Sequence, residues 1–277
     1  MPVPVSRPVS LPASRPTPSR RAVVRGTAWT APLLVVSTAA PAFAASTCTA
    51  SYSYLLDWGT TPWSRASALS AYATIASTNG GPTLYAVFSV VTVGNNTPDA
   101  TRNLTIPPNS GMGTTLDPVV TNLGAIGGNM RGVRFQHSAS QAGRANRQEV
   151  TVTFRKNSTA GPVVNVSGLG FWITDIDAIT TTDYSDRVEL TPAVPAGQQT
   201  RDANITGAGV DGSPNNAWRT TVANSNVGEN ADGARVRISY AAATAFSSFK
   251  LTYWNATGGD QYHRVFLSDL SFSSTGC

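Results

Sequence analysis

The sequence predicts an all-β protein, an antiparallel two-sheet sandwich that follows a cleavable export signal. Three observations support this fold class. Short runs of alternating apolar and polar residues recur along the chain, and clusters of Gly, Asn, Pro and Ser separate them. No long segment has helical periodicity, and only residues 64–74 are expected to form a turn or two of helix. About 230 residues follow Cys48, which suits one large β domain.

Residues 1–44 have the composition of an export signal and not of a folded domain. Proline recurs through the first 18 residues, which disfavours both helix and central strand. Two arginines, a mostly apolar stretch over 26–43 and the small-residue site Ala42–Ala44 then follow in signal-peptide order. A membrane anchor is the alternative, but Thr, Ser and Pro interrupt the apolar stretch. We therefore expect a mature domain over 45–277 with no transmembrane segment.

The run Ser19–Arg25, SRRAVVR, resembles the twin-arginine export motif S-R-R-x-F-L-K, with Val replacing Phe and Leu, and Arg replacing Lys. The leader as a whole is similar to those of uncharacterised secreted actinobacterial proteins. This resemblance implies that the protein is secreted or held at the cell surface, and it does not bear on activity. Export of the unfolded chain by the general pathway is the alternative.

The basic net charge of the chain belongs to the leader. The chain has 20 Lys and Arg against 15 Asp and Glu, and residues 1–44 contribute five Arg and no acid. The mature chain is therefore close to neutral. Its charge gives no support to nucleic acid binding, and we expect no nucleic acid partner.

The two cysteines, Cys48 and Cys277, lie at the two ends of the mature chain. A single pair of cysteines in an exported protein most simply forms a disulfide bond. Such a bond requires the two Cα atoms to lie within about 7 Å. First and last strands that lie side by side would meet this requirement, so we expect segments 50–57 and 265–273 to be neighbours. A lipid-modified Cys48 is the alternative.

Nine segments are predicted as strands because apolar and polar residues alternate within them or because they are continuously apolar. They are Ala50–Asp57, Leu84–Val93, Gly132–His137, Val150–Phe154, Leu169–Asp175, Arg187–Thr191, Arg235–Tyr240, Phe249–Asn255 and Val265–Ser273. Most have one apolar and one polar face, which is typical of antiparallel sheets. Two packed, jelly-roll-like sheets are the economical arrangement, and a closed barrel is the alternative.

Four aspartates lie within a dozen residues, after one predicted strand and before the next. Asp175 and Asp177 would share a face, about 6–7 Å apart, if the first strand continued. Asp183 and Asp186 follow in the loop. Oxygen-rich loops suit Ca²⁺, so one interpretation is a calcium site formed by these four carboxylates. The other is that these side chains hydrogen-bond to turns or form ion pairs.

Tryptophans are the candidate ligand-binding residues. Trp172 and Trp254 occupy the outward phase of their strand patterns, and Trp218 lies in a polar loop. Exposed rings at Trp172, Trp218 and Trp254 would stack on sugar rings. The run Tyr262–Phe272 is similar to the final strand of jelly-roll carbohydrate-binding domains. That resemblance implies an extracellular or cell-wall glycan as partner.

The sequence favours a non-catalytic binding protein over an enzyme. The stretch DIDAIT over 175–180 aligns with the E-x-D-x-x-E strand of family-16 glycoside hydrolases but lacks both outer Glu residues. His137 and His263 are interpreted as strand or surface residues, because no G-x-S-x-G motif accompanies them. The favoured function is a glycan-binding or surface-interaction module. A secreted hydrolase on the same scaffold and a structural envelope protein are the alternatives.

Overall fold

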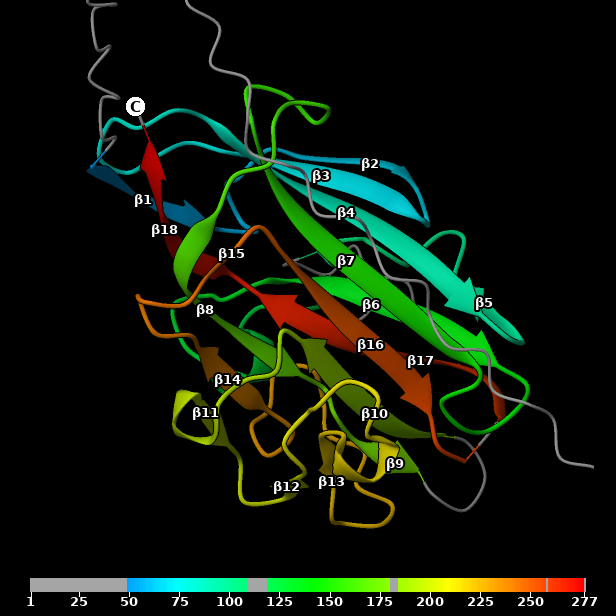
Figure 1. Ribbon diagram of the computed structural model, residues 1–277. Coiled ribbons are helices and arrows are strands. Elements are labelled where there is room, and N and C mark those ends of the chain that lie inside the picture. Colours follow the sequence, from blue (N-terminus) through cyan, green and yellow to red (C-terminus); the bar gives the residue numbers. More distant parts are fainter. Residues whose placement is uncertain (1–48, 109–118, 180–183, 258, 277) are drawn as a thin grey trace, which may run out of the picture. The chain divides into compact units, whose positions relative to one another are not determined.

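A computed structural model describes residues 49–108, 119–179, 184–257 and 259–276, which belong to one compact unit, Thr47–Cys277. Two antiparallel sheets pack face to face as a sandwich (Figure 1), as the sequence predicts. In the described residues the helical elements are three short 3₁₀ turns, Leu123–Ala125, Ala196–Gln198 and Pro214–Asn216. None of the described helices is long and apolar enough to cross a membrane.

The first sheet contains nine of the described strands, with the main order β1-β18-β8-β17-β6-β5. Its strands are β1 (Ala50–Leu56), β5 (Asn96–Pro98), β6 (Gly132–Ala139), β8 (Val166–Thr174), β11 (Gln199–Arg201), β14 (Val236–Ser239), β15 (Ala245–Phe246), β17 (Gly259–Ser268) and β18 (Leu270–Gly276). Strand β8 is central, because it pairs with β17 and β18 and also with β14 and β15.

The second sheet has the order β2-β3-β4-β7-β16-β10-β9. Its strands are β2 (Trp63–Ser67), β3 (Ser70–Ile75), β4 (Leu84–Val93), β7 (Arg147–Lys156), β9 (Ala178–Ile179), β10 (Tyr184–Thr191) and β16 (Ser248–Asn255). A separate small pair is formed by β12 (Ile205–Thr206) and β13 (Arg219–Thr220). Figure 1 shows this second sheet laid over the first.

Aromatic side chains from both sheets fill the space between them. Phe171 of β8 stacks on Phe249 of β16, with ring centroids 5.3 Å apart. Phe154 of β7 meets Phe272 of β18 at 4.8 Å. All four rings are buried, and such pairs stabilise a core by about 0.5–1.5 kcal/mol beyond their area burial. The alternating pattern of each strand therefore directs one face to a shared core.

Two local predictions are wrong. Residues 64–74, expected to be helical, form the β2–β3 hairpin, in which Trp63 pairs with Ala73. Alternation over Ser70–Ile75 puts Ala71, Ala73 and Ile75 on the buried face, and this tertiary burial overrides helix propensity. The single strand expected over 265–273 is divided at Asp269, because β17 continues along β6 while β18 turns to pair with β1.

The first and last strands are neighbours, as predicted. Strands β1 and β18 pair over their full lengths, and Ala50 lies opposite Gly276. These residues lie two positions after Cys48 and one before Cys277 in the sequence. Both cysteines fall outside the described residues, so the disulfide bond stays a prediction.

Candidate functional site

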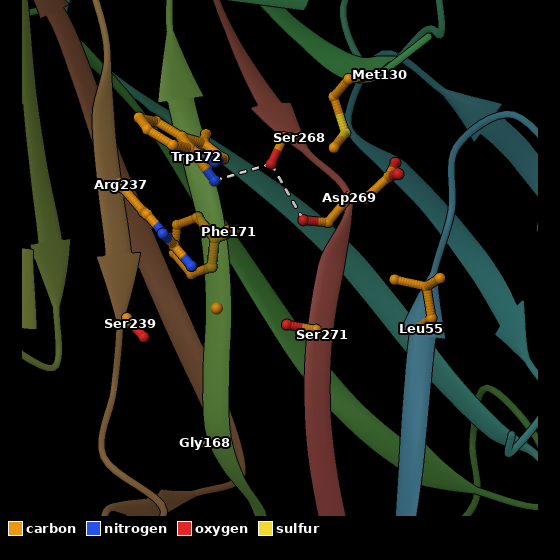
Figure 2. Close-up of a pocket in the computed structure, with 11 residues that line it drawn as sticks. Leu55, Met130, Gly168, Phe171, Trp172, Arg237, Ser239, Ser268, Asp269 and Ser271 are labelled. Carbon is orange, nitrogen blue, oxygen red and sulfur yellow. Dashed lines mark hydrogen bonds between the residues drawn. The ribbon is translucent and has the colours of Figure 1, made fainter. Parts of the chain in front are cut away.

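A groove of about 360 Å³ lies on the outer face of the first sheet (Figure 2). Its floor is formed by outward-facing residues of β8, β14 and β18. These residues are small: Gly168 and Gly170 on β8, Ser239 on β14 and Ser271 on β18. A Cβ atom added to Gly170 would lie 3.1 Å from Oγ of Ser271, so glycine keeps the floor low there. The groove therefore follows from a run of small residues on adjacent strands.

Trp172 lies at one end of this groove, on the outward phase of β8 as the sequence predicts. Its backbone N–H donates a hydrogen bond to Oγ of Ser268 at 2.8 Å, which ties β8 to β17 beside the groove (Figure 2). The guanidinium carbons of Arg235 and Arg237 lie 5.3 and 5.9 Å from its ring centroid. Because the ring face is electron-rich, these contacts hold the half-buried indole in one orientation.

Asp269 supplies the carboxyl group among the residues that line the groove. One of its oxygens, Oδ1, accepts the backbone N–H of Trp58 at 2.9 Å. Burial, opposed by the hydrogen bond from Trp58, raises the pKa of Asp269 to about 6. The group is therefore mainly ionised at neutral pH and can accept hydrogen bonds from a ligand in the groove.

Trp218 does not present its ring to solvent, so the expectation of an exposed loop tryptophan is wrong. Its side chain is fully buried and belongs to the main core. Its backbone pairs with that of Val188 in β10, and its indole N–H donates to Oε1 of Gln199 at 2.9 Å. A Cβ atom on Gly209 would lie 2.5 Å from the indole ring, so the loop packs closely over it.

Trp254 is also buried, with 2% of its surface exposed, so the prediction that its ring is exposed for ligand binding is wrong. Its strand phase is outward from the core, because the inward positions of β16 are held by Phe249, Leu251 and Tyr253. The guanidinium carbon of Arg144 lies 6.0 Å from the centroid of the Trp254 ring. Arg144 is held in turn by Glu189 and Asp211. The ion-paired Arg144 therefore covers the Trp254 ring, which the sequence pattern predicts to be exposed.

A second, smaller cavity of about 40 Å³ is lined by two of the four predicted aspartates, and a third lies beside it. Asp175 and Asp177 line it, together with Tyr184, Asn226 and residues of β17. The two carboxylates do not share a strand face, because β8 ends at Thr174 and Asp175 has a φ of +67°. Asp186 is fully buried and reaches this group from β10: its Oδ2 lies 3.4 Å from the backbone N–H of Asp177.

Buried aromatic and histidine side chains extend this carboxyl cluster into the core. The Tyr253 hydroxyl donates to Oδ1 of Asp186 at 2.8 Å, and Nδ1 of His263 lies 3.0 Å from the same oxygen. The His137 ring lies 4.2 Å from the His263 ring and 4.6 Å from that of Tyr253. The polar groups of both sheets therefore meet at one end of the sandwich.

The carboxyl groups of the cluster favour their neutral forms. Burial and the nearby Asp186 raise the pKa of Asp177 to about 8, against a hydrogen bond from the Val227 N–H. Burial raises the pKa of Asp186 to about 8 as well. Burial and the charge of Asp177 raise the pKa of Asp175 well above its usual value, although Arg264 opposes this. Burial and His263 lower the pKa of His137.

The calcium interpretation gains no support from these groups. Within the described ranges, no set of three or more His, Cys, Asp or Glu side chains is arranged to hold a metal ion. The guanidinium of Arg264 lies 3.4 Å from Oδ2 of Asp175 and also pairs with Glu229. A positively charged side chain of the protein therefore already lies beside the carboxyl groups of this cavity. Asp183, the fourth predicted ligand, lies outside the described residues.

The burial of His137 and His263 in this cluster was not predicted from the sequence, although the strand patterns contain a signal for it. Val133, Phe135 and His137 share one phase of β6, and His263 shares its phase on β17 with Val265 and Leu267. Each histidine therefore continues an apolar row that points into the core. Period-two alternation alone would have placed both rings inside the sandwich.

The chain is thus a β-sandwich protein with a groove of mixed polar and apolar lining on one sheet and a buried carboxyl–histidine cluster at one end. No family model matches it, and neither a curated protein nor a solved structure matches it.

Proposed function

We propose that this protein is a non-catalytic, secreted or cell-surface glycan-binding module whose ligand lies in the groove beside Trp172. The observation that carries the proposal is the composition of that groove. One half-buried indole, one carboxylate and one exposed guanidinium border a floor of glycines and serines. Sugars present apolar C–H faces and many hydroxyl groups, and such a surface offers partners for both.

The size of the groove suits a short saccharide. Its volume of about 360 Å³ lies at the lower end of the range of roughly 300–1,000 Å³ found for small-molecule sites. The groove is open along the sheet face and extends from Trp172 towards Leu55 of β1 (Figure 2). A single sugar ring, with its neighbours continuing along the sheet, would fit this shape.

A glycoside hydrolase is the weaker candidate, because neither site combines space with paired carboxylates. Glycosidases place two carboxyl groups on either side of the bond they cleave. Among the described residues that line the groove, Asp269 is the one acidic side chain. The cavity at Asp175 and Asp177 has several carboxyl groups, but its volume of about 40 Å³ holds about one or two water molecules.

The predicted export signal supports an extracellular place of action. The twin-arginine-like run and the Ala42–Ala44 site are features of exported proteins, and glycans of the cell wall or of other cells lie outside the membrane. A glycan-binding protein at this extracellular location would attach to such polymers.

Glycan-array binding by the secreted, processed protein tests the proposal. We expect binding to a subset of saccharides and its loss in Trp172→Ala. Tyr85→Ala is the matched control, because Tyr85 is a partly buried aromatic on the outer face of the second sheet. Unchanged binding in Trp172→Ala would place the ligand elsewhere, and the absence of binding to any glycan would remove the function.

A further inference from the structure

We propose that the groove selects acidic saccharides, with the guanidinium of Arg237 binding a carboxylate of the sugar. This inference rests on the glycan-binding function proposed above and names its ligand class. Arg235, which directly precedes β14, and Arg237 within β14 both lie over the Trp172 ring, but they differ in their other partners.

Arg235 is neutralised within the protein. Its Nε and Nη2 donate to the two carboxylate oxygens of Asp202 at 2.8 and 3.0 Å, and its Nη1 donates to the carbonyl of Gly124. The backbone N–H of Arg235 also donates to Asp202. This arginine therefore has a structural role: it anchors a loop and supports the Trp172 ring.

Arg237 has no such carboxylate partner among the described residues. It is exposed and lines the groove, and its guanidinium carbon lies 5.9 Å from the centroid of the Trp172 ring. The two residues are direct partners in the β14–β8 ladder, which fixes their spacing. A cation–π contact uses none of the N–H groups as conventional donors, so a guanidinium without a carboxylate partner keeps N–H donors available for a ligand.

The in-plane donors of a guanidinium match the two oxygens of a carboxylate. The resulting paired hydrogen bonds are charge-assisted and directional, so they discriminate a carboxylate from a hydroxyl group. The Trp172 ring holds Arg237 in place, which reduces the side-chain entropy lost when a ligand binds. Arg237 is therefore preorganised for an anionic group.

The opposite wall of the groove determines the orientation of the ligand. Asp269 carries a negative charge at neutral pH, so it repels a carboxylate and attracts hydroxyl donors. Ser239, on the same strand as Arg237, and Ser271 of β18 add hydroxyl groups to the groove lining, both paired with Gly170 of β8. An acidic sugar would consequently place its carboxylate at Arg237 and its hydroxyl groups towards Asp269.

Binding of polygalacturonate oligosaccharides, measured by calorimetry on the processed protein, tests this assignment. The same oligosaccharides as methyl esters are the neutral comparison, and a sulfated dextran oligosaccharide is the second anion. We expect the ester to bind roughly tenfold to a hundredfold more weakly, which is the loss expected for a charge-assisted hydrogen bond. Arg237→Gln should weaken carboxylate binding to the same extent, and Arg237→Lys should retain part of it.

Arg155→Gln is the matched control, since Arg155 lies on β7 of the other sheet and donates to the carbonyl of Gly161. Equal binding of ester and acid, or an unchanged affinity in Arg237→Gln, would overturn the acidic-sugar inference. If Trp172→Ala still abolished binding, the proposed function would survive that result. Tight, Arg237-dependent binding of the sulfated oligosaccharide instead would overturn the carboxylate assignment. If no saccharide bound, both proposals would fail together.

Discussion

Ala50 lies directly opposite Gly276 in the antiparallel pairing of β1 and β18, so the two ends of the folded chain are adjacent. This pairing brings the backbone near both cysteines to neighbouring strands, which are spaced about 4.8 Å apart. This adjacency is the arrangement that a bond between Cys48 and Cys277 requires.

We predict that Cys48 and Cys277 are joined in the exported protein. Intact-mass analysis with and without reduction should find no free thiol before reduction. Replacing both residues with Ser should lower the melting temperature but leave the β-rich circular dichroism spectrum, because the strands pair without the bond. Chain-entropy arithmetic gives an upper estimate of roughly 5 kcal/mol for the lost stability. Two free thiols in correctly exported protein would contradict the prediction.

We predict that the mature chain begins at Ala45. N-terminal sequencing of protein from the culture medium measures this directly, and a start within the proline-rich leader would show the cleavage site to be wrong.

If the twin-arginine pathway carries the protein, replacing both Arg20 and Arg21 with Lys should abolish export. Normal secretion of that double variant would favour the general pathway.

We predict that Trp218→Ala lowers the free energy of unfolding by about 3–5 kcal/mol, because it removes a fully buried indole from the core. Chemical denaturation measures this change. Trp172→Ala is the comparison and should have a much smaller effect, since its ring is only half-buried. Similar losses for the two variants would contradict the different roles that the structure gives them.

We predict that the melting temperature falls from about pH 6.5 to about pH 8 and levels off above that, and that Asp177→Asn reduces this fall. The folded-state pKa of Asp177, about 8, is above its unfolded value near 4. Between these two pKa values the folded state binds more protons than the unfolded state, so stability falls as pH rises towards 8 and changes little above it. The depressed pKa of His137 acts in the opposite direction, but only at pH below about 6.5.

Asp211→Asn is the control for this pH experiment. Burial would raise the pKa of Asp211, but hydrogen bonds from Thr191 and Lys250 hold it well below its usual value. Its contribution is therefore present above about pH 4 and is lost only as pH falls below that. Asp211→Asn should lower the melting temperature evenly from about pH 6.5 to about pH 8. An equal change of slope in both variants would show that the buried cluster is not responsible.

We predict that millimolar Ca²⁺ leaves the melting temperature unchanged, because Arg264 already pairs with Asp175, and Asp186 accepts a hydrogen bond from Tyr253. An ion that binds only the folded state must raise that temperature. Thermal melts with Ca²⁺ and with a chelator provide the comparison. A clear rise with Ca²⁺, removed by Asp175→Asn, would restore the calcium interpretation.

The sequence by itself determined the fold class, most of the strands and the outward phase of Trp172. It could do so because period-two alternation is a local property: in a strand, successive side chains point to opposite faces whatever the partner strand is. The adjacency of the first and last strands was also predictable, from the positions of the two cysteines. The same alternation directs His137 and His263 into the sandwich, in phase with the apolar residues of their strands.

The tertiary structure alone decided which polar and aromatic residues meet. Trp218 is buried because its loop pairs with Val188, thirty positions earlier, and Trp254 is buried because Arg144 packs over it. The groove is lined by residues that are far apart in the sequence, from Leu55 to Ser271. The buried cluster likewise brings Asp175 near both histidines, with side chains from strands of both sheets. A local pattern gives the direction of each side chain from its own strand. What covers that side chain depends on pairings between distant segments, which a local pattern does not encode.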